Sequence, residues 1–522
     1  MPSSRTDTDF VSYRKVLTIL IFIEKQDQIR SFIDNQLHDG LLPLQKIGDS
    51  SNDCQLVLPN SNVLHPCFQG WENVHVSSFE NYQRKLNAPY FKFEDDICRH
   101  YCFPENVALP FIHQDPCIEG GFAHVMKVAL PREHGNLETC DQQEGKEKQL
   151  LAIKRLCRRS RGPFEAESNV LYRLNSISKH READHVVKLL ATFEIDSQID
   201  PELYFIFPCA DCDLRQFWKE IRKPPDEAYR WRLSKWVARQ MRGLSHGLLV
   251  LHQFARFRVD SDLDPRNRGI HGDIKPENIL VFKKWNGVED GPGILQLADF
   301  GLARYHRPES VNRVAPRRVP HCYVSPESGL GRETGQASDV WAMGCLFLEF
   351  SVWLLFGYDG LESFTQDRGK QVLEKAHTRV SAFYRSRSVR DHSVESDKIS
   401  INKGVLKWVA KLHSAAWCPQ FIHDVVDIAV LEMLALNHEP QDEAGTLPDL
   451  GETTRTRPSS ERNKYPHRIV VSDLVERLDG MLERGLSYFQ DASPYDSSSF
   501  TPPALTLPSV NSENATDSHT EG

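Results

Sequence analysis

The chain has 522 residues, 40% of them hydrophobic and 26% charged, which is enough for about two to four folded domains. Asp and Glu number 72 against 63 Lys and Arg, and the net charge of −9 argues against a general nucleic-acid-binding protein. The twelve cysteines form no disulfide framework, and no stretch reaches the ~20 apolar residues that cross a bilayer. Since residues 1–9 show no signal-peptide pattern, we expect a cytoplasmic or nuclear protein without membrane or nucleic-acid partners.

Residues 1–108 are expected to form a folded, mostly helical extension. An amphipathic helical stretch covers about residues 9–37, and its apolar run at 17–23 is flanked by charges, as in a buried helix turn. We expect the extension to pack on the domain that follows, because residues 67–111 carry many aromatic rings. The rings are Trp71, Phe79, Tyr82, Tyr90, Phe91 and Phe93.

Two stretches within residues 109–207 are of strand type. Residues 150–154 predict a buried strand that carries Lys154 on its polar side, and residues 203–207 predict a second, continuously apolar strand. Between the two strands, one set of residues recurs at helical spacing, namely Phe164, Glu167, Leu171 and Leu174.

Residues 270–280 place Asp273, Lys275 and Asn278 at offsets of 0, +2 and +5, where three side chains can converge on one phosphoryl group. In-line phosphoryl transfer requires positioning and charge neutralisation more than covalent chemistry. Asp273 would accept or orient the proton of an attacking hydroxyl, and Lys275 would hold the migrating phosphoryl oxygens. Asn278 would give an oxygen ligand to Mg²⁺. The stretch therefore predicts phosphoryl transfer.

Residues 297–303 place Asp299 at the end of a strand, before a Phe-Gly pair and 21 residues after Asn278. Asp-Phe-Gly alone is often a turn, but its order and distance after the previous motif indicate a second metal ligand at Asp299. Residues 285–293 are Gly-rich and acidic, so we expect a hairpin insertion between the two flanking strands. Residues 421–436 predict a further helix.

These motifs resemble the signature set of the eukaryotic protein kinases, and a Lys two residues after the catalytic Asp resembles their serine/threonine branch. Three more segments match the family in order: the Pro-Glu anchor at 324–327, the buried helix at 337–344 and the last landmark at 468–474. Gly272 departs from the pattern, because most members carry Arg there. The extension together with a His-Gly-Asp loop resembles uncharacterised protein-kinase-domain proteins of filamentous fungi.

The resemblance implies an α+β, two-lobed protein-kinase fold. A small β-rich N-lobe would span residues 109–207, and a large helical C-lobe would span residues 208–488. An insertion at about 441–462 and the tail at 489–522 are rich in Ser, Thr, Pro and acidic residues, so we expect both to be disordered.

The resemblance also assigns an ATP site. Lys154 would grip the phosphates and pair with Glu167, since the alternative, Glu165, does not keep the helical register with Leu171. Phe207 would be the gatekeeper. The other implied ATP contacts are Ile118, Gly120, Gly121, Val125, Ala152, Cys209, Ala210, Asp213, Leu280 and Asp299.

Two further roles in the C-lobe follow from the resemblance. Asp339 would support the catalytic loop, and Arg468 would pair with Glu327, an interaction that is costly to break when it is buried. Cys209 and Cys212 have the spacing of a redox or zinc pair, but no second pair lies at ribbon spacing, which favours a hinge between lobes.

The glycine-rich loop over ATP is partly degraded, because Ile118 and Ala123 replace two of the three signature glycines. Glycine lets the backbone approach phosphate oxygens, so we expect weaker nucleotide binding. Pro320 stands where the serine/threonine branch has a Thr next to the substrate hydroxyl, which makes substrate positioning unusual.

The segment at 304–318 carries five arginines, with Tyr305 and Ser310 as its phosphate acceptors. The arginines would dock an acidic substrate or hold a phosphate in cis. Gly272 removes the Arg that normally grips a phosphorylated activation loop, so we predict activity without phosphorylation there.

Two functions therefore compete. The first is a protein serine/threonine kinase that uses ATP and Mg²⁺ on protein substrates. The second is a catalytically weak kinase-fold scaffold that acts through protein–protein interaction, which the degraded loop and Pro320 favour. Small-molecule phosphotransfer is disfavoured by the Pro-Glu anchor and its Arg partner. The oligomeric state stays open.

Overall fold

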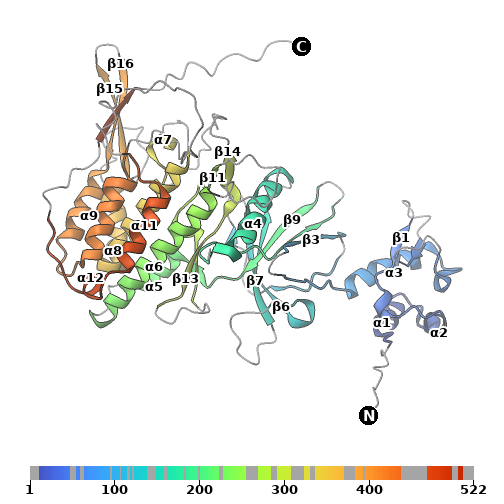
Figure 1. The fold of residues 1–522 in the computed structure, drawn as a ribbon. Coiled ribbons are helices and arrows are strands. Elements are labelled where there is room, and N and C mark those ends of the chain that lie inside the picture. The colour runs from blue at the N-terminus through green and yellow to red at the C-terminus, as the bar shows by residue number, and fades with distance from the viewer. Residues whose placement is uncertain are drawn as a thin grey trace, which may run out of the picture. The chain divides into compact units, whose positions relative to one another are not determined.

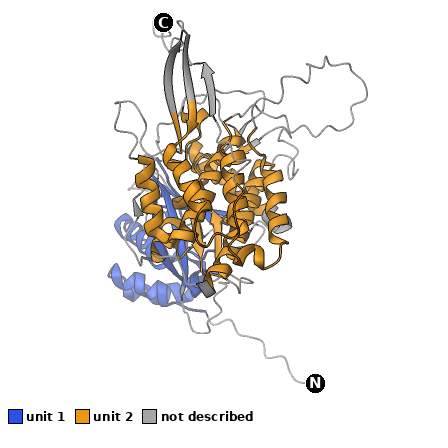
Figure 2. Cartoon of the chain, turned by 90° about the vertical axis from the view of Figure 1, so that its left-hand side faces the viewer, with its two compact units in different colours: residues 1–161, 189–209 blue, residues 162–188, 210–522 orange. Residues whose placement is uncertain are grey.

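The protein is described by a computed structural model, in which the chain divides into two compact units (Figure 2). Unit 1 comprises residues 1–161 and 189–209, and unit 2 comprises residues 162–188 and 210–522. The structure describes residues 11–47, 55–58, 64–94, 97–105, 107–113, 118–119, 123–137, 148–157, 161–181, 184–197, 200–222, 227–253, 268–283, 291–306, 322–329, 335–369, 383–391, 394–436, 467–496 and 504–508.

The first part of unit 1 is a small helical cluster with its own core (Figure 1). Its helices are α1 (Arg14–Phe22), α2 (Ile29–Asp34) and α3 (Asn73–Leu86), with short 3₁₀ turns at Gln26–Gln28, Asp39–Leu41 and Pro66–Phe68. A two-stranded antiparallel pair, β1 (Gln45–Ile47) and β2 (Gln55–Val57), completes it.

The core of this cluster draws all its members from residues 16–86. The Phe32 ring lies 5.6 Å from the rings of Phe68 and Phe79, and Trp71 packs against the same group. Gln83 is fully buried, yet its side-chain amide is satisfied by both backbone groups of Leu44, at 2.9 and 3.0 Å. Part of the predicted aromatic set thus builds a local core.

The second part of unit 1 is a seven-stranded sheet in the order β3-β8-β9-β7-β6-β4, with β5 paired to β6. All its pairs are antiparallel except β3 with β8. A 3₁₀ turn at Arg132–His134 directly follows β6. The strands are β3 (Arg99–Phe103), β4 (Ile112–His113), β5 (Ile118–Glu119), β6 (Ala123–Pro131), β7 (Lys148–Leu156), β8 (Ala191–Ile195) and β9 (Glu202–Pro208).

The sheet begins before residue 109, where the motifs place the start of the N-lobe. β3 pairs in register with β8, and Phe91 and Phe93 belong to the same core cluster as Ile153, Phe193 of β8 and Tyr204 of β9. The last part of the predicted extension is therefore built into the sheet, because its alternating aromatic residues supply one face of that core.

Strand parity separates the two faces of the sheet. Successive side chains point to opposite faces, and register partners share a face. Leu151, Ile153 and Ile206 lie in the core cluster, so Lys154 and its register partner Phe205 lie on the opposite face. The sheet therefore presents one packed face and one face that carries the predicted phosphate-binding lysine.

Unit 2 is mostly helical, and with the sheet of unit 1 it gives the expected α+β class. In Figure 1, α6 (Glu227–His252) runs alongside α11 (Val471–Leu482), where Arg242 Nε donates to Asp479 Oδ1 at 2.7 Å. The helices are α4 (Arg161–Arg181), which begins at the last residue of unit 1, α5 (Leu214–Glu220), α6 (Glu227–His252), α7 (Pro326–Gly329), α8 (Gln336–Gly369), α9 (Lys403–His413), α10 (Gln420–Asp427), a π-helix (Ile428–Met433), α11 (Val471–Leu482) and α12 (Ser487–Gln490).

Short strands in unit 2 frame the predicted catalytic loop. β10 (Cys212–Asp213), β12 (Ile279–Phe282) and β13 (Ile294–Leu297) form one antiparallel sheet. β11 (Arg268–Ile270) pairs with β14 (Arg304–His306), and 3₁₀ turns occur at Pro276–Asn278 and Phe300–Leu302. The antiparallel pairing of β12 with β13 confirms the predicted hairpin, although residues 284–290 between the two strands lie outside the described residues.

Helix α8 forms the centre of unit 2. Gly357 interrupts it with φ 67° and ψ −169°, a backbone conformation that favours glycine. Among the described residues, α8 is the one helix long and apolar enough to cross a membrane by length and composition, and 94% of its most apolar window is buried inside the structure. Burial on all sides is typical of a central core helix.

Residues 489–496 and 504–508 of the tail are ordered, which corrects the expectation of disorder for these residues alone, since 497–503 and 509–522 lie outside the described residues. Ser493 accepts from His423 Nε2 through its carbonyl at 2.9 Å, and Tyr495 OH donates to Asp427 Oδ1 at 2.8 Å. β17 (Ala504–Pro508) pairs with β16 (Val394–Ile401), which also pairs with β15 (Tyr384–Asp391). Composition predicted disorder because the few apolar residues of this short strand are outnumbered by the polar residues around it in the tail. The predicted insertion at 441–462 lies outside the described residues.

His185 is expected to make unit 2 less stable in acid. Its Nδ1 lies 2.8 Å from the Leu295 carbonyl, a Cβ added at Gly243 would lie 2.0 Å from its Nε2, and burial lowers its pKa to about 4. Below about pH 6.5 the unfolded chain binds a proton that the folded chain excludes, so stability falls as pH drops toward 4, by at most about 3 kcal/mol.

Denaturant unfolding at several pH values between 7 and 4 tests this. His185→Asn should lose less stability across that range than the natural protein. Equal pH dependence of the two proteins would rule out His185 as the source.

Candidate active site

The catalytic loop is held by one buried carboxylate. Asp339 Oδ2 accepts from the His271 amide at 2.8 Å and lies 2.9 Å from His252 Nε2, while Oδ1 accepts from the Gly272 amide at 2.8 Å. Gly272 has φ +78°, a left-handed conformation that favours glycine, and a Cβ there would meet only ordinary contacts. The structural role expected for Asp339 is confirmed by these bonds.

The three predicted catalytic side chains converge. Asp273 Oδ2 accepts from Lys275 Nζ at 2.7 Å and from Asn278 Nδ2 at 2.8 Å, and Asn278 Nδ2 also donates to the Asp273 carbonyl at 2.8 Å. Asp273 and Asn278 are each 7% exposed. The 3₁₀ turn at Pro276–Asn278 folds the chain back so that residues five apart meet. The arrangement presents a carboxylate and a cation next to one another.

Asp299 lies two residues after the end of β13, and the backbone of Ala298 bonds to the predicted catalytic loop. The Ala298 amide donates to the Asn278 carbonyl at 2.9 Å, which links the residue before Asp299 to the predicted metal ligand Asn278. Asp299 has φ 62° and ψ 75°, a left-handed conformation that costs about 1 kcal/mol or more for a residue other than glycine and is frequent at functional sites. Strain at Asp299 therefore agrees with a functional role.

Phe300 and His271 pack behind these groups. Their ring centroids are 4.9 Å apart, and both side chains are almost completely buried. Burial lowers the pKa of His271, so the ring is neutral at neutral pH, and its Nδ1 accepts from the Asp273 amide at 3.4 Å. A neutral, packed ring thus fixes the backbone of the proposed catalytic Asp.

The predicted ATP contacts of unit 1 line up across the sheet. Ile118, Val125 and Lys154 are successive register partners on β5, β6 and β7, and Ala152 is opposite Phe207 on β9. Val125, Ala152, Lys154 and Phe207 lie on the face opposite the core cluster by strand parity. Gly120 and Gly121 lie outside the described residues.

The two candidate partners of Lys154 differ in how far they are exposed to solvent. Glu167 is 3% exposed, whereas Glu165 is exposed, which favours Glu167 as the residue kept away from water. Lys154 is 9% exposed, and its Nζ lies 5.8 Å from the Phe205 ring centroid. The ion pair between Lys154 and Glu167 stays a prediction.

The predicted hinge coincides with the boundary between the units, which falls between Cys209 and Ala210. Asp213 caps α5, because its Oδ1 accepts from the Gln216 amide at 2.8 Å, and it is the register partner of Leu280. Burial raises the pKa of the Cys212 thiol to about 11, so this thiol stays protonated at neutral pH. The hinge interpretation is therefore favoured over a redox pair.

Sequence reasoning missed a buried polar network behind the catalytic loop. Glu349 accepts from Arg368 at 3.1 Å and from the Tyr323 hydroxyl at 2.6 Å, and Arg215 donates to the same hydroxyl at 2.6 Å. Arg215 also donates to Glu277 at 3.1 Å, within the 3₁₀ turn that ends at Asn278. A signal was present, since Glu349 interrupts a long apolar run.

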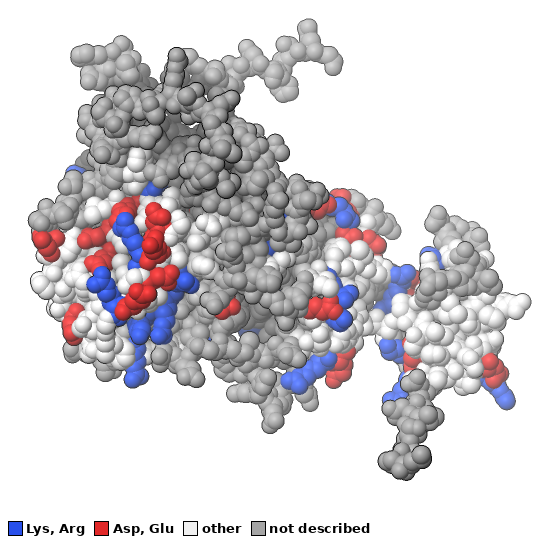
Figure 3. All heavy atoms as spheres, viewed as in Figure 1, with Lys and Arg blue, Asp and Glu red and all other residues white. Residues whose placement is uncertain are grey.

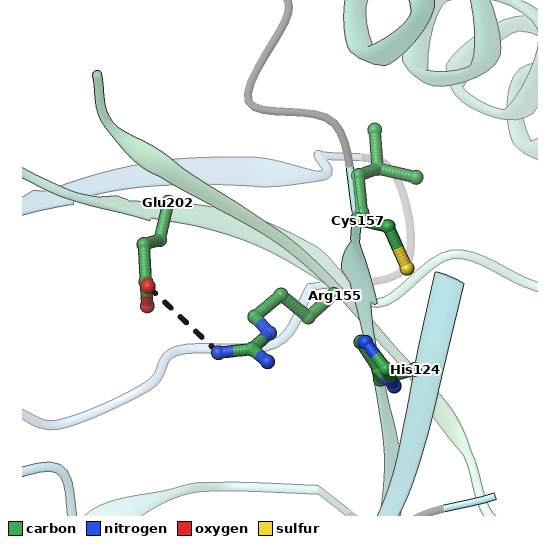
Figure 4. A pocket seen from close by; sticks show the side chains of 5 residues that line it. His124, Arg155, Cys157 and Glu202 are labelled. Carbon is green, nitrogen blue, oxygen red and sulfur yellow. Dashed lines mark ion pairs between the residues drawn. The ribbon is translucent and has the colours of Figure 1, made fainter. Parts of the chain in front are cut away.

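Unit 1 also contains a cavity of about 160 Å³ (Figure 4). Arg155 and Glu202 face one another across it at 3.7 Å. Arg155 neighbours Lys154 in β7, so the two side chains lie on opposite faces of the sheet. The cavity is lined by His124, Arg155, Leu156, Cys157 and Glu202, none of which is a predicted ATP contact.

The fold and the loop at residues 270–280 agree with a protein kinase domain. Residues 135–412, more than half of the chain, match the family model of the protein kinase domain. The chain therefore belongs to the protein kinase family.

Two relatives have serine/threonine or cyclin-dependent kinase names. A G-type lectin S-receptor-like serine/threonine-protein kinase of Arabidopsis thaliana is 30% identical over 44% of this chain and 22% of its own length. Cyclin-dependent kinase 7 of Dictyostelium discoideum is 31% identical over 32% of this chain and 37% of its own length. The chain thus spans well under half of each relative, and the resemblance to fungal proteins stays a prediction.

Proposed function

We propose that the protein transfers the γ-phosphoryl group of ATP to serine or threonine hydroxyls of protein substrates, with Mg²⁺. The observation that carries the proposal is the Asp273 carboxylate, held at 2.7 Å by Lys275 and at 2.8 Å by Asn278. Membership of the protein kinase family and the serine/threonine-protein kinase among its relatives support the same assignment.

The residues present fit a magnesium ion. Both hydrogen bonds of the Asn278 amide nitrogen go to Asp273, which orients the amide oxygen as the group presented to a cation. Asp299 adds a carboxylate, so the donor set consists of oxygen atoms, which Mg²⁺ prefers. When bound, Mg²⁺ neutralises charge on the phosphates.

The residues of the proposed site then have distinct roles. Asp273 orients the substrate hydroxyl and receives its proton, while Lys275 balances negative charge beside it. Lys154 would hold the ATP phosphates from the sheet of unit 1. Asp339 keeps the loop backbone in place through the two amides that it accepts.

A scaffold without catalysis is the second candidate. In the structure Ile118 and Ala123 lie in paired strands, where they face Val125 and Leu156 in register. Side chains at these two positions remove the close backbone approach that glycine permits. This feature favours weak nucleotide binding.

A phosphoryl-transfer assay with labelled ATP and Mg²⁺ tests the proposal. We expect autophosphorylation or labelling of a generic protein substrate, and a loss of roughly 10²–10³-fold for Lys154→Ala, the size of effect seen when a preorganised charge-stabilising group is removed. Lys46→Ala, which changes an exposed lysine of β1, is the matched control. Equal labelling by the natural protein and Lys154→Ala would refute catalysis, and a thermal shift with ATP would then identify a nucleotide-binding scaffold.

Activity is expected without phosphorylation of the activation segment, because Gly272 replaces the arginine that would bind the phosphate. Phosphatase treatment should therefore leave the rate within about twofold, since no charge-assisted contact is lost. A variant with Tyr305→Phe and Ser310→Ala should behave in the same way. A large fall in rate after either change would contradict the expectation.

We propose a protein substrate that is acidic near the phosphorylated residue, in the cytoplasm or the nucleus. The arginines of residues 304–318 support the acidic substrate, although those after Arg304 lie outside the described residues. Figure 3 shows basic and acidic side chains interspersed on the visible face of unit 2. That no nucleic acid or membrane is bound stays a prediction.

A further inference from the structure

Four polar side chains form a group on β3 and β8 that the phosphotransfer centre does not use. His100 and Cys102 alternate on β3, and their register partners on β8 are Thr192 and Glu194. Alternate residues share a face, and partners in register lie side by side, so the four side chains project from one face of the sheet. The strand pairing itself therefore brings a nitrogen, a sulfur and an oxygen donor together.

The three possible ligand atoms are close to one another. One atom each from His100, Cys102 and Glu194 lies within 4.8 Å of the other two, and His100 Nε2 is 3.8 Å from Glu194 Oε2. Zn²⁺ bonds of about 2.0–2.3 Å in a tetrahedron place ligand atoms roughly 3.3–3.8 Å apart. Small rotations of the side chains are enough to reach that geometry.

The histidine is already oriented as a ligand. His100 Nδ1 lies 2.9 Å from Oγ1 of Thr192, whose side chain is fully buried, and this contact turns Nε2 toward Glu194. Histidines that bind metals commonly use the other ring nitrogen in this way, which fixes the tautomer and the ring plane. Thr192 would therefore act as a positioning residue.

Arg161 currently occupies part of the site. Its Nη2 donates to Glu194 Oε1 at 3.1 Å and lies 2.9 Å from Oε2. The Arg161 side chain is 55% exposed, whereas that of Glu194 is 8% exposed. The arginine can turn into water, but the carboxylate is fixed in place.

We propose that His100, Cys102 and Glu194 form a Zn²⁺ site at the edge of the sheet, with water as the fourth ligand and with Arg161 as its competitor. A mixed set of imidazole, thiolate and carboxylate suits Zn²⁺ better than Mg²⁺ or Ca²⁺, which prefer oxygen ligands alone. His100 and Cys102 are exposed, which gives the ion a path from solvent.

The test is a titration of metal-free, full-length protein with Co²⁺, followed by displacement with Zn²⁺. The natural protein should give a thiolate-to-cobalt charge-transfer band that saturates at one equivalent and disappears when Zn²⁺ is added. Cys102→Ser should lose the band and weaken Zn²⁺ binding at least about tenfold, and Thr192→Val should weaken it by about 10–100-fold. Cys157→Ser, which alters an exposed thiol of the same unit, should keep the band.

Arg161→Gln separates competition from simple loss of structure, because it keeps every ligand. Zn²⁺ affinity should rise in this variant, since the cation no longer competes with a guanidinium group. An unchanged or lower affinity would overturn the role of Arg161. The site itself would be overturned by an unchanged band in Cys102→Ser, by loss of the band in Cys157→Ser, or by absence of Zn²⁺ binding to the natural protein.

Discussion

Replacing Asp273 with asparagine is expected to lower the rate of phosphoryl transfer by about 10²–10⁴-fold, the usual contribution of a general base. The amide keeps the size of the side chain but cannot receive the hydroxyl proton. The change also removes the carboxylate charge that balances Lys275. Asp273 Oδ2 accepts from Lys275 Nζ at 2.7 Å and from Asn278 Nδ2 at 2.8 Å in the natural protein. The measurement is the single-turnover rate with saturating ATP and a protein substrate.

Asp473→Asn is the matched control for Asp273→Asn, because it makes the same chemical change at an exposed position in the first turn of α11. The control should retain the natural rate, and both variants should show the natural circular dichroism spectrum. An Asp273→Asn variant with the natural rate would remove Asp273 from the mechanism and favour a different base.

Replacing Arg468 with alanine is expected to destabilise unit 2 by about 3–5 kcal/mol, the cost of breaking a buried ion pair. Arg468 donates to both carboxylate oxygens of Glu327, at 2.6 and 3.3 Å, and to the carbonyls of Ala337 and Ala435, at 2.7 and 3.0–3.1 Å. Its removal leaves the buried Glu327 carboxylate, the buried Ala435 carbonyl and the partly buried Ala337 carbonyl without that donor. Denaturant unfolding of the full chain measures the loss.

Two variants make this expectation specific. Arg477→Ala breaks a half-exposed pair with Glu432, so it should cost at most about 1 kcal/mol. Combining Arg468→Met with Glu327→Leu removes the buried charges together and should recover part of the loss, although the two carbonyls still lack their donor. A loss of under 1 kcal/mol for Arg468→Ala would show that the pair does not stabilise the fold.

The parts of the site that could be predicted from sequence are those set by local spacing. The offsets within residues 270–280 were enough to predict that Asp273, Lys275 and Asn278 meet, because a single 3₁₀ turn joins them. The pairing of Arg468 with Glu327, which lie 141 residues apart in the chain, is also confirmed. That prediction rested on the resemblance to the kinases and not on local geometry.

The features that were missed depend on partners far apart in the chain. Glu349, Arg368, Tyr323 and Arg215 meet only after the helices pack, and no short motif joins them. β17 was assigned to a disordered tail because composition cannot show that β16 offers it a pairing edge. Burial of Glu167 agrees with the helical-register argument, whereas its contact with Lys154 stays a prediction.

β3 also has a consequence for how far the chain can be shortened. The strand covers the outer edge of β8, and Phe91 beside it is fully buried in the sheet core. A chain that began at residue 109, where the kinase motifs place the lobe, would leave β8 with a row of unpaired backbone groups and an open apolar surface. Such edges pair with strands of other molecules and cause aggregation. We therefore expect β3 and Phe91 to keep the kinase domain soluble.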